Sequence, residues 1–298
     1  MVQREFIIRS RRVDDLVMDR EPSRGTKELT PDVVRAFQKL IYHYYQEHGR
    51  IFPWRMTHNP YHILVSEIML QQTQTERVVG KYELFINCFP DFSSLAEAPL
   101  GEILRVWQGL GYNRRTIALK RIAQTVMTRF HGNLPSSSEA LMTLPGIGRA
   151  TASAICAFAF NQPVVFIETN IRRVFIHHFF QNGNSINDTE ILPLVEKTLD
   201  TSNPRKWYFA LMDYGVMVKK ESQNPNRRSA HYQKQSPFED SNRQIRGMIL
   251  KALIMESDVS ERQIVQRLET NPKRVKRNLI QLQKEGFIIK KGNRFMIA

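Results

Sequence analysis

Glu67 is the residue whose type and setting most clearly indicate catalytic chemistry. Apolar residues surround it at helical spacing: Ile63, Leu64, Ile68 and Leu70. A carboxyl group in apolar surroundings is expected to have a raised pKa, which suits a general acid that works near neutral pH. A half-buried glutamate with a purely structural role fits the same pattern, so this position alone leaves both interpretations open.

A glycine-containing turn between two helical segments, LPGIGRATA from Leu144 to Ala152, is the second candidate. Two glycines so close together allow a tight turn and let backbone N–H groups approach a phosphate, while the positive end of the next helix adds favourable potential. An ordinary turn between helices would require neither both glycines nor the proline. We therefore expect the turn to bind DNA backbone through Gly146, Ile147, Gly148, Arg149 and Thr151.

Helices are needed to position these residues, and the central two hundred residues have a helical pattern. Segments of ten to fifteen residues alternate with short Pro, Gly and Asn clusters, and no run of alternating strands is evident. The first helix is expected to begin with Thr30 as N-cap and Pro31 in its first turn. The sequence predicts an all-α domain over residues 29–238, after a flexible basic arm over residues 1–28.

Residues 239–298 have a different pattern, which resembles a small winged helix-turn-helix domain. Helices are predicted over Arg243–Met255, after a Ser260 cap, and from Asn271 onward, and a hairpin turning at Lys291–Asn293 follows them.

The predicted third helix of this domain is basic at its start, with Lys273, Arg274, Lys276 and Arg277. A helix-turn-helix protein contacts the duplex with that part of the helix, so we expect DNA binding there. A module for protein–protein contact, with solvated charges, is the alternative.

The overall charge agrees with a nucleic-acid partner. The chain has 43 Lys and Arg against 29 Asp and Glu, a formal charge of +14 and a pI near 9.9. From Ser241 onward there are 13 basic and 5 acidic residues. Such a charge favours polyanions through phosphate neutralisation and counterion release. A generically basic protein is the alternative at this level.

The two cysteines, Cys88 and Cys156, lie in apolar stretches and are expected to be buried, reduced thiols. They cannot form a disulfide framework or a cysteine-based metal site. The apolar runs are far shorter than a membrane span, and the N-terminus lacks the apolar core of a secretory signal. We therefore expect a cytoplasmic protein.

Four motifs together resemble the helix–hairpin–helix-GPD superfamily of DNA glycosylases. They are FPWR with PYHILVSEIMLQQTQ, then WQGLGYNRR, then LPGIGRATA, then ETNIRRV, in that order over about residues 35–237. Within the superfamily, the MutY-type adenine glycosylases are the most similar. The resemblance implies an all-α fold of two helical lobes with the active-site cleft between them.

The resemblance also implies roles for individual residues. Glu67 would protonate the purine and then handle the attacking water, and Glu168 would be the second carboxylate, beside the sugar. Asn170 would help to hold the catalytic centre, and Tyr112 would wedge beside the base opposite. Gln71, Gln72 and Thr73 would belong to the loop that enters the duplex near the flipped base.

The second carboxylate departs from the family pattern, because the family has Asp where this chain has Glu168. The charge is kept on a side chain one methylene longer, so its distance from the sugar must be set by a shift of backbone or rotamer. A misplacement of about 1 Å can cost roughly 100-fold in rate.

Two further departures remove chemistry that relatives use. Ala150 stands where endonuclease III-type relatives carry the Schiff-base lysine, which predicts a monofunctional enzyme without that lyase route. MutY-type enzymes hold an iron–sulfur cluster with four cysteines, and here those positions are Lys219, Asn226, Ser229 and Gln235, none of which can ligate iron in such a cluster.

These departures predict a glycosylase without a cofactor or metal, in which the winged helix stands where relatives carry a NUDIX-like domain that recognises 8-oxoguanine. We expect a monomer that binds double-stranded DNA in the nucleoid and removes adenine opposite guanine or 8-oxoguanine. A thymine or uracil mismatch glycosylase is the enzymatic alternative. A non-catalytic DNA-binding or regulatory protein on a degenerate glycosylase core is the alternative of another class.

Overall fold

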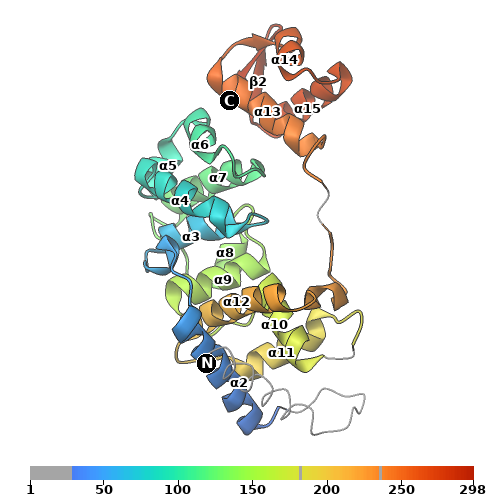
Figure 1. Cartoon of the computed structure of the whole chain (residues 1–298). Helices are drawn as coiled ribbons and strands as arrows, with labels where there is room; N and C mark the ends of the chain where they lie inside the picture. Colours follow the sequence, from blue (N-terminus) through green and yellow to red (C-terminus); the bar gives the residue numbers. More distant parts are fainter. Residues whose placement is uncertain (1–28, 181–182, 235–236) are drawn as a thin grey trace. The chain divides into compact units, whose positions relative to one another are not determined.

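The computed structural model describes residues 29–180, 183–234 and 237–298 (Figure 1). The predicted N-terminal arm, residues 1–28, lies outside this range. The chain divides into two compact units, each built from two separate stretches. Unit 1 combines Met1–Phe52 with Gly148–Lys234, and unit 2 combines Pro53–Ile147 with Gln235–Ala298. Within the described ranges, no helix is both long and apolar enough to cross a membrane.

Unit 1 is helical, as predicted. Its elements are α2 (Pro31–His48), α9 (Arg149–Phe160), α10 (Thr169–Phe179), α11 (Asp188–Thr198), α12 (Pro204–Glu221) and the 3-10 turn η2 (Pro225–Arg228). The predicted start of the first helix is confirmed, because the Thr30 side chain accepts from the backbone N–H of Val33 and Pro31 occupies the first turn.

The core of unit 1 forms where α10 and α2 pack on α12. Phe37 is fully buried and contacts the rings of Phe175 and Trp207 at centroid distances of 5.6 and 5.9 Å. Helix α12 lies close to α10 at Gly215, where an added Cβ would lie 2.5 Å from the carbonyl oxygen of Asn170. Only glycine leaves room for α10 at this point.

Unit 2 begins with a helical lobe. Its elements are η1 (Pro53–Arg55), α3 (Pro60–Leu70), α4 (Thr75–Cys88), α5 (Phe92–Glu97), α6 (Leu100–Trp107), α7 (Arg114–Arg129) and α8 (Ser138–Met142). Large aromatic residues fill its core: Trp107 and Phe85 are fully buried with ring centroids 5.9 Å apart. The expectation of an all-α central domain is confirmed over the described part of residues 29–234, where the β-pairing is limited to an isolated bridge between Ile186 and Ser229.

The C-terminal module, residues 237–298, completes unit 2. It contains α13 (Asn242–Met255), β1 (Val259–Ser260), α14 (Glu261–Leu268), α15 (Pro272–Lys284), β2 (Ile288–Lys291) and β3 (Arg294–Ile297). The predicted helices and hairpin are confirmed, with Ser260 and Asn271 as N-caps and the hairpin turning at Gly292 and Asn293. The antiparallel sheet has the order β1-β3-β2.

An apolar core joins this module to the lobe. Leu100 and Leu104 of α6 belong to the same buried cluster as Ile245 and Ile249 of α13 and Phe295 of β3. The lobe therefore contributes Leu100 and Leu104 to the hydrophobic core of the module.

An ion-pair cluster lies beside this shared core. Glu285, whose side chain is 14% exposed, pairs with Arg114 of α7 at 2.6 Å and with Arg246 of α13 at 2.5 Å. Gln281 also donates to it, at 2.6 Å. Burial acts to raise the pKa of Glu285, but the hydrogen bonds from Arg114, Gln281 and Arg246 outweigh it and lower the pKa to about 2.

One expectation was wrong. Cys156 is buried in α9, as expected, whereas Cys88 is exposed at the last position of α4. The apolar segment around Cys88 is amphipathic rather than fully buried, because Phe85 and Phe89 point to the core and the end of the helix leaves position 88 in solvent.

Replacing Glu285 should weaken the attachment of the module. Glu285→Gln removes the ionised acceptor of two arginines, so we expect a loss of about 1–3 kcal/mol in the free energy of unfolding at neutral pH. The folded-state pKa lies below that of the unfolded chain, so this stabilisation is present above pH ~4.5 and is lost as the pH falls toward about 2. Thermal unfolding of both proteins from pH 7 to pH 2 measures this difference.

Glu269→Gln is the matched control, because Glu269 is an exposed carboxylate of the same module. Two results would contradict the role of Glu285: an equal loss of stability in both variants, or a difference in the free energy of unfolding between Glu285→Gln and wild type that persists at pH 2.

Candidate active site

Glu67 lies on α3, a helix that is otherwise almost entirely buried. Asn59 caps it by accepting from the backbone N–H of Tyr61 at 2.9 Å. The residues on either side of Glu67, Ser66 and Ile68, are each 1% exposed, whereas Glu67 itself is half-buried. The helix thus holds the carboxyl group between buried neighbours and leaves it partly accessible, as a general acid requires. The predicted raised pKa of Glu67 stays a prediction.

Arg115 fixes the two loops of unit 2 that carry predicted site residues. Its side chain is buried, and its guanidinium donates to backbone carbonyl groups of both loops. The acceptors are Ile68, Met69 and Gln71 at 3.0, 2.6 and 2.8 Å, and Leu110, Gly111 and Tyr112 at 3.2, 3.0 and 3.4 Å. Burial lowers its pKa to about 10, so it remains charged at neutral pH.

The loops that Arg115 holds contain residues in uncommon backbone conformations. Gln72 has a φ of 53° and Tyr112 a φ of 46°, in the left-handed region that a residue with a side chain adopts only at a cost of about 1–3 kcal/mol. Gln71 donates from Nε2 to the carbonyl of Gly146 at 3.4 Å, which places the predicted duplex-entering loop beside the glycine turn.

The glycine turn has the predicted tight geometry. Gly146 has a φ of 78°, and an added Cβ would lie 3.1 Å from the Cβ of Ala118, so a side chain is disfavoured there on two counts. Leu144 and Ile147 are buried and Gly146 is exposed. The apolar residues fix the turn and leave its backbone accessible.

The helix after this turn, α9, belongs to unit 1. Gly148 is its N-cap and provides no side-chain acceptor, and Gly148, Arg149 and Ala150 are exposed. The backbone N–H groups of the first helical turn lack intrahelical acceptors, and their orientation favours an anion. Thr151 lies in the same turn and is half-buried.

Glu168 is the N-cap of α10, a role that its position before Thr169 did not reveal. Its Oε1 accepts from the backbone N–H groups of Asn170 and Ile171 at 2.7 and 2.9 Å, and Asn170 Nδ2 donates to Oε2 at 3.2 Å. Burial raises the pKa of Glu168 above its ordinary value, although these N–H groups and the charge of Arg173 act to lower it. The carboxylate is thus fixed by its own helix rather than extended into solvent.

Asn170 is held in turn by Arg173, which is 4% exposed. Arg173 Nη1 donates to Asn170 Oδ1 and to the carbonyl of Gly215, both at 2.7 Å, and Nε donates to Asn224 Oδ1 at 3.1 Å. A continuous hydrogen-bonded chain therefore runs from the segment after α12 through Arg173 and Asn170 to Glu168.

The segment that holds an iron–sulfur cluster in MutY-type enzymes is held here by side-chain hydrogen bonds. Asn226 is buried and donates to the carbonyl of Thr169 at 2.8 Å, and Arg228 donates to the carbonyl groups of Ile176 and Phe180. Ser229 is buried, and Lys219 is exposed on α12. Amide, hydroxyl and ammonium groups do not ligate such a cluster, so the residues present do not fit it. The fourth position, Gln235, lies outside the described residues.

Among the described residues, no group of three or more His, Cys, Asp or Glu side chains could hold a metal ion.

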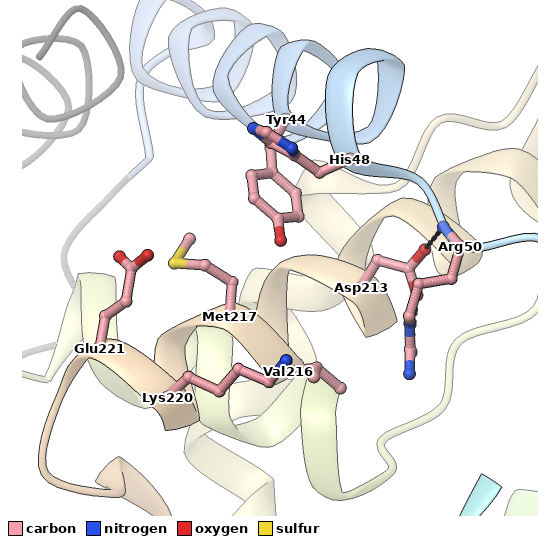
Figure 2. Close-up of a pocket in the computed structure, with 8 residues that line it drawn as sticks. All are labelled: Tyr44, His48, Arg50, Asp213, Val216, Met217, Lys220 and Glu221. Carbon is pink, nitrogen blue, oxygen red and sulfur yellow. Dashed lines mark hydrogen bonds and ion pairs between the residues drawn. The ribbon is translucent and has the colours of Figure 1, made fainter. Parts of the chain in front are cut away.

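A pocket of about 240 Å³ opens elsewhere in unit 1, beside α12 and the end of α2 (Figure 2). Asp213 lies in it and binds Arg50 through the backbone N–H at 2.8 Å and through Nε at 2.7 Å, which fixes the chain as it leaves α2. None of the predicted catalytic or DNA-binding residues lines this pocket, so we assign it no part in the chemistry.

The basic residues of α15 differ in availability. Lys273, Lys276 and Arg277 are exposed. Arg274 is half-buried and pairs with Asp240. Three of the four predicted DNA contacts thus face solvent, and the fourth binds the segment before α13.

The predicted catalytic and loop residues fall into two groups, apart from those of α9 and α15. Unit 2 brings the loop of Gln71, Gln72 and Thr73, Tyr112 and Gly146 into one hydrogen-bonded region around Arg115, which begins at Ile68, next to Glu67. Unit 1 contains Glu168 and Asn170 in another, around Arg173. Sequence reasoning missed both arginines. The WQGLGYNRR and ETNIRRV motifs contain them, but a basic residue in a motif does not reveal that it is buried.

Residues 65–197 match a family model described as HhH-GPD superfamily base excision DNA repair protein. An adenine DNA glycosylase from Buchnera aphidicola subsp. Baizongia pistaciae is 38% identical over 188 residues, which are 61% of this chain and 53% of the relative. An adenine DNA glycosylase from Mycobacterium tuberculosis is 43% identical over 133 residues, 44% of this chain and 43% of the relative. The chain thus spans about half the length of the curated relatives it matches.

A solved structure of a thermostable thymine-DNA glycosylase is similar with a TM-score of 0.58 and 26% identity, over 64% of this chain and 90% of that one. This similarity confirms the expected glycosylase fold of the helical part.

Neutralising Glu168 should not destabilise the protein. Glu168→Gln keeps an oxygen that accepts from the two backbone N–H groups and removes the buried charge, at the cost of the longer, 3.2 Å bond that Asn170 Nδ2 donates to Oε2. A raised folded-state pKa means that stability is lost as the pH rises through that pKa, so wild type carries this cost at neutral pH. At pH 7 we expect the variant to unfold at the wild-type temperature or a few degrees above it. This difference in melting temperature should disappear at acidic pH.

Glu196→Gln, an exposed carboxylate of the same unit, should show no such trend. A clearly lower melting temperature for Glu168→Gln at pH 7 would mean that the ionised cap stabilises the fold.

Proposed function

From the premise that residues 65–197 of this chain belong to the HhH-GPD superfamily of base excision DNA repair proteins, we propose that the protein is a monofunctional DNA glycosylase that removes adenine from mismatches with guanine or 8-oxoguanine. The observation that carries the proposal is Glu67, a half-buried carboxyl on a buried helix, beside loops that Arg115 holds in strained conformations. The similarity to adenine DNA glycosylases favours adenine as the base.

Glu67 acts first as an acid in this proposal. Adenine is a poor leaving group until a ring nitrogen is protonated, and the nucleotide must leave the stack to reach the acid. The proton from Glu67 lets the bond from C1′ to N9 break, with its electron pair going to the base. Glu67, now ionised, takes a proton from the water that attacks C1′.

Glu168 stabilises the positive charge that develops on the sugar as this bond breaks. The N–H groups of Asn170 and Ile171 hold its oxygens, which keeps the carboxylate in place without reorganisation during the reaction. Since Glu168 must be ionised, activity falls when the pH drops below its raised pKa.

No lyase step belongs to the proposal, because Ala150 has no amine to form a Schiff base. We also propose that no iron–sulfur cluster takes part. The hydrogen bonds of Asn226 and Arg228 to α10 support this, since they join the same segment to the fold.

Double-stranded DNA is the proposed partner, bound by a monomer in the cytoplasm at the nucleoid. Tyr112 would wedge beside the base opposite the excised adenine. The exposed cations of α15 would bind phosphates, as the third helix of a winged helix-turn-helix domain does.

A second candidate is a thymine or uracil mismatch glycosylase. It is favoured by the similarity to a thymine-DNA glycosylase over 90% of that chain. Base release from defined duplexes separates the two candidates, and release of no base would favour a non-catalytic DNA-binding protein.

Single-turnover base release is the decisive measurement. Duplexes with A, T, U or hypoxanthine opposite G or 8-oxoguanine are incubated with excess enzyme, and alkali then reveals abasic sites. We expect release of adenine, reduced about 10²–10⁴-fold in Glu67→Gln, which is the range for loss of a general acid. Strand cleavage without alkali would contradict the monofunctional assignment.

Glu76→Gln is the control, because Glu76 is an exposed carboxylate on the next helix. Faster release of thymine or uracil than of adenine would replace the leading candidate by the second one.

The DNA-binding role of α15 has a separate test. We expect the combined Lys276→Ala and Arg277→Ala variant to reduce the slope of log affinity against log salt by about 2, because each phosphate contact contributes about 0.9. Lys251→Ala removes an exposed charge from α13 and should leave the slope unchanged. Equal slopes for all three proteins would make α15 a protein-contact surface instead.

A further inference from the structure

Tyr112 of the lobe is in direct contact with the C-terminal module. Its hydroxyl oxygen accepts a hydrogen bond from Nη1 of Arg243 at 2.8 Å. Arg243 lies in the first turn of α13, and 131 residues separate it from Tyr112 in the chain. The contact therefore exists only because the module packs on the lobe.

Both sides of this contact are fixed. Nη2 of Arg243 also donates to the carbonyl of Pro237 at 3.2 Å. The ring of Tyr112 has two guanidinium neighbours, that of Arg243 at 5.6 Å from the ring centroid and that of Arg115 at 5.5 Å. Guanidinium groups at this distance attract an aromatic ring, so both restrict the orientation of Tyr112.

The attachment of the module makes the contact more than an incidental surface pair. The shared core of Leu100 and Leu104 with α13 and the pairing of Glu285 with Arg114 join the same two parts of unit 2. Within the module, Glu285 also pairs with Arg246 of α13. Several independent contacts thus hold α13 in one place on the lobe, and Arg243 with it.

Tyr112 needs such support, because its backbone lies in the left-handed region with Gly111 before it, also at a positive φ of 70°. Arg115 holds the backbone of this turn through the carbonyls of Gly111 and Tyr112, but backbone hydrogen bonds do not fix where the ring points. Contacts made by the side chain must therefore do so.

We propose that Arg243 is a positioning residue for Tyr112, through which the C-terminal module controls how the enzyme discriminates the base opposite the excised one. This inference rests on the proposed function. Arg243 would not contact the reacting atoms; it would hold the tyrosine ring in the orientation that enters the duplex beside the opposing base.

A double-mutant cycle on base release tests the coupling. Rates are measured for adenine opposite 8-oxoguanine and opposite cytosine, in wild type, Arg243→Ala, Tyr112→Phe and the double variant. The discrimination is the ratio of the two rates. Each single substitution should reduce this ratio about five- to tenfold, the effect of losing one hydrogen bond, and the double variant should reduce it no more than either single one. Lys251→Ala removes a charge from the same helix and should match wild type.

A second measurement does not depend on catalysis. A 2-aminopurine placed next to the opposing base becomes more fluorescent when an aromatic wedge unstacks it. We expect wild type and Lys251→Ala to raise the fluorescence on binding, and Arg243→Ala to lose most of that rise. Melting temperatures close to wild type would show that the module remains attached.

The outcomes separate the two proposals. If wild type releases no base from any duplex but raises the fluorescence in an Arg243-dependent way, the proposed function fails and the positioning role stands. The positioning role is overturned by additive effects of Arg243→Ala and Tyr112→Phe, by equal losses in Arg243→Ala and Lys251→Ala, or by the absence of a fluorescence rise in wild type.

Discussion

The buried guanidinium of Arg115 is the interaction on which the candidate site of unit 2 depends. It donates to carbonyl groups at the end of α3 and in the turn that leads to Tyr112, so one side chain sets the spacing of two loops. A planar fork of donors can satisfy several carbonyls at once, which a lysine could not do. Even with its pKa lowered to about 10, the group stays charged and keeps all its donors at neutral pH.

A buried arginine has the same role in unit 1, where Arg173 donates hydrogen bonds to Asn170, to the carbonyl of Gly215 and to Asn224. In each unit a carboxylate proposed for the chemistry lies on or next to a helix whose end is fixed by a buried arginine. The segment after α12 thereby reaches Glu168 through hydrogen bonds alone. Such a network is rigid only while every polar group in it has a hydrogen-bond partner, so the position of Glu168 depends on complete pairing.

Local features of this fold were predictable from the sequence, and distant ones were not. Helix starts at Thr30, Ser260 and Asn271 depend on a cap within three residues, and all three were placed correctly. The contacts of Arg115 and Arg243 join residues tens of positions apart, and no periodicity encodes them. The exposure of Cys88 was missed for a related reason, since an apolar neighbourhood does not say which way the last turn of a helix faces.

The construction of unit 2 from two stretches has a consequence for how the chain is made. On a ribosome, α6 emerges well before the module that covers Leu100 and Leu104, and all of α9 to α12 is translated in between. At a translation rate of about 5–20 residues per second, this apolar face stays uncovered for roughly 7–30 s, until Ile245 and the residues after it are synthesised. Nascent chains interrupted in that interval would expose an unpaired hydrophobic surface, a target for chaperones that the finished protein no longer presents.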